Sequence, residues 1–171
     1  MRERSIIGYL VSDHARLHGF LDRAMALPSL DLEAFAAFRR GLLRHIAIEE
    51  RVLFPAVRKA RGGLVLDRAH ELRIDHAALT SLLVPTPDLG LCHEILSLLS
   101  THDAKEEPPG GIYEECERWL NDDDLILLAE QAVSFPEVRV ARHFDGPNVY
   151  RTAEDALASA RRLRAPKTSS G

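Results

Sequence analysis

A chain of 171 residues suits one domain with a buried core, and its 46% hydrophobic and 28% charged residues are typical of a soluble globular protein. The formal net charge of −4 gives no general attraction to phosphate, which argues against a nucleic-acid partner. No apolar run approaches the roughly 18 residues that span a bilayer, so we expect no membrane partner. Cys92 and Cys116 form no C-x-x-C motif and favour reduced thiols in a cytoplasmic protein.

Four long amphipathic helices are expected over the first two thirds of the chain, at about residues 4–26, 32–60, 66–84 and 88–107. Pro28, Gly62-Gly63 and Pro85-Thr86-Pro87 separate them, and Pro55 can bend the second. Apolar residues recur along each at helical spacing and form one buried face. Helices of this kind with short connections predict an all-α, up-down-up-down four-helix bundle.

The pattern changes after Glu107. Pro108-Pro109-Gly110-Gly111 must interrupt the fourth helix, and shorter helices are expected at about 112–120, at 123–133 and from Thr152 onward. We therefore divide the chain into a bundle domain, 1–107, and a C-terminal, mostly helical appendage packed on it, 108–171. The last residues, 167–171, are expected to be disordered.

Histidine is the unusual residue, with eight copies. Asp13-His14 on the first helix returns as Asp75-His76 on the third, and His-x-x-x-Glu-Glu at 45–50 on the second returns at 102–107 on the fourth. The chain thus repeats one two-helix unit. A His and a Glu four residues apart project from the same side of a helix, so both units aim these side chains at the core.

Metal binding is the chemistry that this repeat favours. Unpaired glutamates on apolar faces would cost several kcal/mol each, and a divalent cation removes that cost. Imidazole with carboxylate suits iron, manganese or zinc, whereas calcium and magnesium prefer oxygen ligands. The predicted ligands are His14, His45, Glu49, His76, His102 and Glu106. His18, on the same face as His14, is a further candidate ligand, with a hydrogen-bonding neighbour of the site as its alternative role.

The remaining polar residues receive less specific interpretations. His70, His93 and His143 are assigned to the surface. Glu50 and Glu107 lie about 140° from the histidine of their own motif and are expected on a solvated flank. Two roles stay open for Asp13 and Asp75: each either orients the adjacent histidine, His14 or His76, or lies on the helix surface.

The four motifs, Asp-His-x-x-Leu, His-x-x-x-Glu-Glu-x-x-Leu-Phe-Pro, Asp-His-x-x-Leu and His-x-x-x-Glu-Glu, together resemble the hemerythrin-like, or HHE cation-binding, domains over about residues 5–107. The resemblance implies two non-haem iron ions in the bundle, bridged by Glu49, Glu106 and an oxo or hydroxo oxygen, with manganese or zinc as alternatives. The break at Pro108 departs from the family and places Glu106 in the final turn of its helix.

The resemblance also implies a small partner, dioxygen or another diatomic ligand. Binding, sensing or storage of dioxygen, or a response to iron or redox state, is the leading interpretation. An enzyme that acts on peroxide or nitric oxide, or that repairs iron–sulfur proteins, is the alternative. The sequence identifies no protein partner.

Overall fold

Three of the four bundle helices begin at side-chain caps that the sequence supplies. A computed structural model describes residues 4–26, 28–107 and 109–164. Ser5 caps α1 (Ile6–Met25), Asp31 caps α2 (Leu32–Ile48) and Asp88 caps α5 (Leu89–Glu106), each by accepting a first-turn backbone N–H. α4 (Ala69–Leu82) has no side-chain cap. The predicted disorder of 167–171 lies outside the described residues.

The second bundle helix continues past Pro55 by widening for one turn. α2 runs into a π-helical turn, η2 (Glu49–Leu53), and then into α3 (Phe54–Ala60). The backbone N–H of Phe54 donates to the carbonyl of Glu49, five residues back. Proline cannot donate to the helical ladder, and π-helical turns are frequent at functional sites. The expected bend at Pro55 is therefore a wider turn that begins at Glu49.

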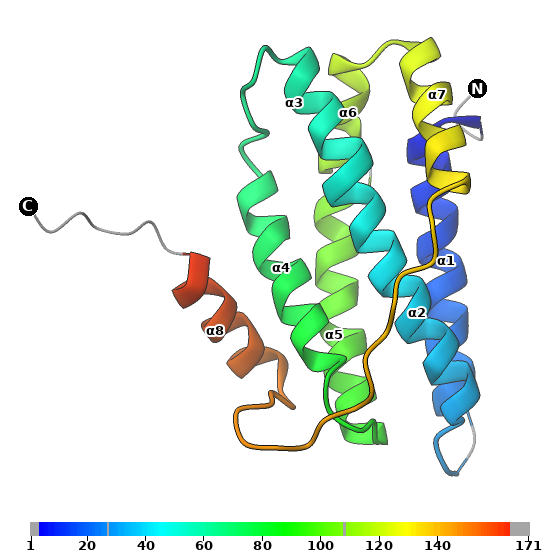
Figure 1. The fold of residues 1–171 in the computed structure, drawn as a ribbon, viewed down its shortest axis with the longest axis vertical. Helices are drawn as coiled ribbons and strands as arrows, with labels where there is room; N and C mark the ends of the chain where they lie inside the picture. Colours follow the sequence, from blue (N-terminus) through cyan, green and yellow to red (C-terminus); the bar gives the residue numbers. More distant parts are fainter. Residues whose placement is uncertain (1–3, 27, 108, 165–171) are drawn as a thin grey trace, which may run out of the picture.

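The fold is all-α in the part of the chain described, with four antiparallel bundle helices formed by α1, the α2–α3 unit, α4 and α5 (Figure 1). α1 packs on α2 and α5, and α4 packs on α5. The predicted up-down-up-down bundle is confirmed. None of the helices in the described ranges combines the length and the apolarity that crossing a membrane requires.

Three shorter helices follow the bundle: α6 (Ile112–Trp119), α7 (Asp122–Val133) and α8 (Ala153–Arg164). α6 contacts α3 and α5 at one end of the bundle, α7 packs on α1, and α8 packs on α4 (Figure 1). The segment between α7 and α8 follows α2, where Arg39 donates to the carbonyl of Ala141 at 2.9 Å. Whether residues 1–107 form a separate domain stays a prediction.

Two apolar cores fill the bundle, one toward each end. One contains Leu17 and Leu21 of α1 with Phe35 and Phe38 of α2, and the other contains Ile7 and Leu10 of α1 with residues of η2, α3 and α6. On α1, the α2–α3 unit and α4, buried polar side chains lie between the residues of the two cores, and on α5 they follow the residues of the first core. These side chains include His14, His45, Glu49, His76, His102 and Glu106.

Candidate metal centre

The His/Glu centre, defined by these six residues, draws one histidine from each bundle helix. The histidines are at most 3% exposed, and Glu49 and Glu106 are fully buried. The side chains form two groups in which all donor atoms lie within 4.8 Å of one another. The first group is Glu49, His76, His102 and Glu106; the second is His14, His45 and Glu106. Glu106 belongs to both groups, so it is placed to bridge two cations.

The distances between donor atoms divide the oxygens of Glu106 between the groups. In the first group, Oε1 of Glu106 is 3.1 Å from Nε2 of His102 and 3.7 Å from Nε2 of His76. In the second, Oε2 of Glu106 is 3.3 Å from Nε2 of His14, which is 3.0 Å from Nε2 of His45. Oε2 of Glu49 is 3.1 Å from Nε2 of His76.

Each histidine of the centre is oriented by a carboxylate at its other ring nitrogen. The four Nδ1-to-oxygen pairs are Glu107–His14 at 2.8 Å, Glu50–His76 at 2.9 Å, Asp13–His45 at 3.0 Å and Asp75–His102 at 3.4 Å. An ionised carboxylate only accepts hydrogen bonds, so each Nδ1–H donates and each Nε2 faces the centre.

The pairing explains why the motifs read Asp-His and His-x-x-x-Glu-Glu. The aspartate of each unit orients the second histidine of its own unit, whereas the second glutamate orients the first histidine of the other unit. The expectation that Glu50 and Glu107 belong to a solvated flank is wrong. Both are half-buried partners of the centre.

Arginine and lysine side chains bind three of these four carboxylates from the side that faces away from the centre. Arg73 donates to Glu50 at 3.1 Å, and Lys105 donates to Asp75 at 2.6 Å. Arg16 donates to Asp13 through Nε at 2.7 Å. Burial raises the pKa of Asp13, but hydrogen bonds from His45 and Arg16 outweigh it and hold the pKa below its usual value. The pKa values of Glu50 and Asp75 are likewise lowered against burial, so these groups stay ionised.

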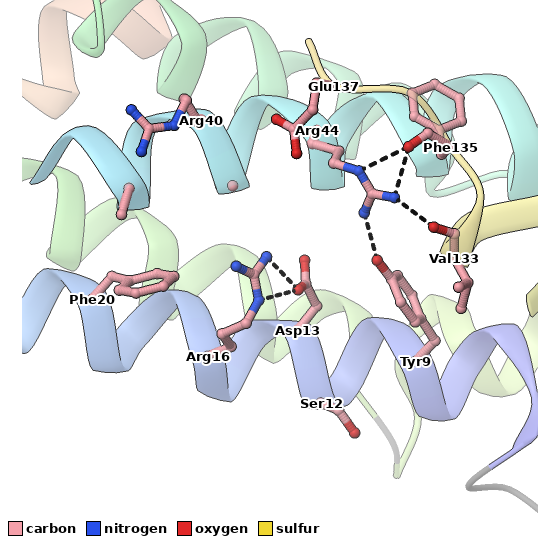
Figure 2. Close-up of a pocket in the computed structure, with 12 residues that line it drawn as sticks. Tyr9, Ser12, Asp13, Arg16, Phe20, Arg40, Arg44, Val133, Phe135 and Glu137 are labelled. Carbon is pink, nitrogen blue, oxygen red and sulfur yellow. Dashed lines mark hydrogen bonds and ion pairs between the residues drawn. The ribbon is translucent and has the colours of Figure 1, made fainter. Parts of the chain in front are cut away.

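Figure 2 shows a cleft between α1 and α2 that is lined by the Arg16–Asp13 pair, in which Arg16 is exposed and Asp13 is buried. Arg44, from the same cleft, donates to the carbonyls of Ala132, Val133 and Phe135 and to Tyr9 Oη. Its N–H groups thereby satisfy backbone carbonyls at the end of α7 and just after it. The cleft reaches the centre only indirectly, through the carboxylate of Asp13.

The donor set fits a pair of cations. Oε2 of Glu49, Nε2 of His76 and Oε1 of Glu106 are buried, and they make no hydrogen bond although donor atoms of the centre lie as near as 3.1 Å. Burial lowers the pKa of His14, yet Glu106, Asp103 and Glu49 raise it to about 10. Burial also opposes protonation of His102, but Glu106 and Asp75 raise its pKa to about 9. Protons on these imidazoles offset the buried carboxylates, and metal cations would replace them.

Comparison with known protein families also indicates a cation-binding domain. The family described as Hemerythrin HHE cation binding domain matches residues 5–107. The chain belongs to the hemerythrin family. Neither the comparison with curated proteins nor that with solved structures gave a match. The hemerythrin match and the buried His/Glu centre together identify a metal-binding protein.

His18 lies at the edge of the hemerythrin centre. Its Nε2 is 2.6 Å from Oδ2 of Asp103, its side chain is 28% exposed, and it belongs to neither donor group. Its role as a ligand stays a prediction. His70, His93 and His143 are exposed, as expected.

Tyr113 contacts the His/Glu centre but was missed by sequence reasoning, and it lies beyond the hemerythrin match. Its hydroxyl donates to Oε1 of Glu49 at 2.5 Å and is 3.2 Å from Oε2 of Glu106. Burial and the charges of Glu106 and Glu49 raise the pKa of Tyr113 well above its usual value. The phenol therefore keeps its proton and serves as a hydrogen-bond donor to Glu49 when no cation is bound.

Gly111 brings Tyr113 to the centre by turning the chain back over the end of α5. A Cβ at position 111 would lie 2.2 Å from the carbonyl oxygen of Glu106 and 2.3 Å from that of Glu107. Only glycine permits this approach, after which α6 starts and its second residue is Tyr113. The Pro-Gly break signalled the end of α5, but no local signal gave the direction of the turn.

Proposed function

We propose that this hemerythrin-family protein holds two non-haem iron ions and binds dioxygen at them, for storage or sensing. The observation that carries the proposal is the sharing of Glu106 by two buried donor groups. Mixed imidazole and carboxylate donors suit iron, and the same donors accept manganese or zinc. His14, His45 and Glu106 would hold one ion, and Glu49, His76, His102 and Glu106 the other.

The residues of the chain supply geometry, charge and exclusion of water. Asp13, Glu50, Asp75 and Glu107 keep each Nδ1 protonated and each Nε2 directed inward. Bound iron supplies the redox chemistry. Because the donor residues are at most 3% exposed, the centre favours a ligand as small as a diatomic molecule over a larger substrate.

Dioxygen titration of anaerobically purified, iron-loaded protein tests the proposal. We expect saturable uptake of about one dioxygen per iron pair, released when oxygen is removed. Catalytic consumption of peroxide or nitric oxide, without reversible dioxygen uptake, would instead establish the enzyme alternative. Uptake that is unchanged in metal-free protein would refute the proposal.

A further inference from the structure

The two donor groups of the His/Glu centre are unequal. One group has four residues and the other has three, His14, His45 and Glu106. The hydroxyl oxygen of Tyr113 lies beside the smaller group, 3.2 Å from Oε2 of Glu106 and 3.5 Å from Nε2 of His14. From this placement we propose that Tyr113 is a further protein ligand, completing the smaller group as its fourth donor.

The spacing of the atoms supports coordination. Two ligands that each lie about 2.1 Å from one ion, at right angles, are about 3 Å apart. The His14–His45 and His14–Glu106 donor distances, 3.0 and 3.3 Å, are near this value. The distances from Tyr113 to Glu106 and His14 are similar, so one ion can contact all these donors after small shifts.

The surroundings of Tyr113 hold its oxygen in place. The side chain is fully buried, and its ring stacks on the ring of His14 with centroids 5.9 Å apart and planes inclined by 21°. Ile112 and Cys116, on either side of it in α6, are fully buried in the same core. The phenol thus approaches the centre from a packed helix, which favours a fixed ligand position.

Coordination exchanges a proton for a metal ion. In the metal-free protein the phenol O–H donates to Glu49. On binding, the O–H bond breaks, the proton leaves to solvent, and the phenolate oxygen bonds to the ion. No electron moves in this exchange, and a ferric ion would favour the phenolate more than a ferrous ion would.

The inference that Tyr113 is a ligand rests on the proposed iron content. Absorption spectroscopy tests the ligand separately from the iron content. The full chain is loaded anaerobically with ferrous iron, oxidised with air, and examined for iron content and for phenolate-to-iron charge transfer in the visible range. The chain contains three tyrosines, Tyr9, Tyr113 and Tyr150, so each can be replaced in turn. Resonance Raman scattering excited in the visible band identifies phenolate ring vibrations without any substitution.

We expect the wild-type protein to show these phenolate signals. Tyr113→Phe should lose them while keeping about two irons per chain, and Tyr150→Phe, whose hydroxyl bonds to Ser159 far from the centre, should keep both. Two bound irons without phenolate signals in the wild-type protein would overturn the inference and leave the iron proposal intact. Signals that persist in Tyr113→Phe would also overturn it. A failure to bind iron would refute the proposed function.

Discussion

Glu50→Gln tests whether the outer carboxylates tune the centre. Oε1 of Glu50 is 2.9 Å from Nδ1 of His76, and its other oxygen accepts from Arg73 at 3.1 Å. Glutamine keeps the size of the side chain but removes the negative charge that makes Nε2 of His76 a stronger metal ligand. Loss of such a partner lowers metal affinity by about 10- to 100-fold. At about 1.4 kcal/mol per tenfold change, this equals roughly 1.4–2.8 kcal/mol of binding free energy.

Competition with a chromophoric chelator measures the change, with Glu71→Gln as the matched control. Glu71 is an exposed carboxylate on the same helix, α4. We expect Glu50→Gln to release metal at lower chelator concentration with an unchanged number of metals at saturation, and Glu71→Gln to match the wild-type protein. Equal affinities of all three proteins would refute the role assigned to the Glu50–His76 pair.

Three further predictions concern the centre and its support. Glu106→Ala should lose both metals and destabilise the metal-free fold by about 3–5 kcal/mol, because it leaves buried histidines without their counter-charge; metal analysis and denaturation should show no such effect for His93→Ala. Gly111→Ala should cost about 1–3 kcal/mol in denaturant titrations, since its Cβ meets the backbone of Glu106, and a stability equal to wild type would contradict the tight turn.

The third prediction concerns the change in stability of the metal-free protein with pH. In metal-free protein the pKa of His14 is raised from 6.5 to about 10 and that of His102 to about 9, so the stabilisation from their protonation is complete below about pH 6.5 and is lost toward pH 10. The denaturation midpoint should therefore be lower at pH 9 than at pH 7, and a higher midpoint at pH 9 would contradict this sign.

The helices and the six residues of the centre could be predicted because the information is local and repeated. Apolar spacing fixes the inward face of each helix, and His45 and Glu49, four residues apart, lie on it together. Glu50 was misassigned because its wheel angle was judged against His45. Its actual partner, His76, belongs to another helix, and the packing of neighbouring helices cannot be inferred from one helix alone.

Asp13 and Tyr113 show two other limits of the sequence. Asp13 was left between two roles, and the structure places it on His45 and not on its neighbour His14, because successive helical residues diverge by about 100°. Tyr113 could not be placed, since its position depends on the direction in which the chain turns at Gly111. Its approach to Glu49 and Glu106 is a product of tertiary packing.

The metal content of the purified 171-residue chain tests the central claim most directly. If the two donor groups that share Glu106 hold an iron pair, anaerobically purified and iron-loaded protein should contain about two irons per chain, and Glu106→Ala should contain almost none. Saturation at a single metal, or two metals retained by Glu106→Ala, would contradict a paired centre bridged by this residue.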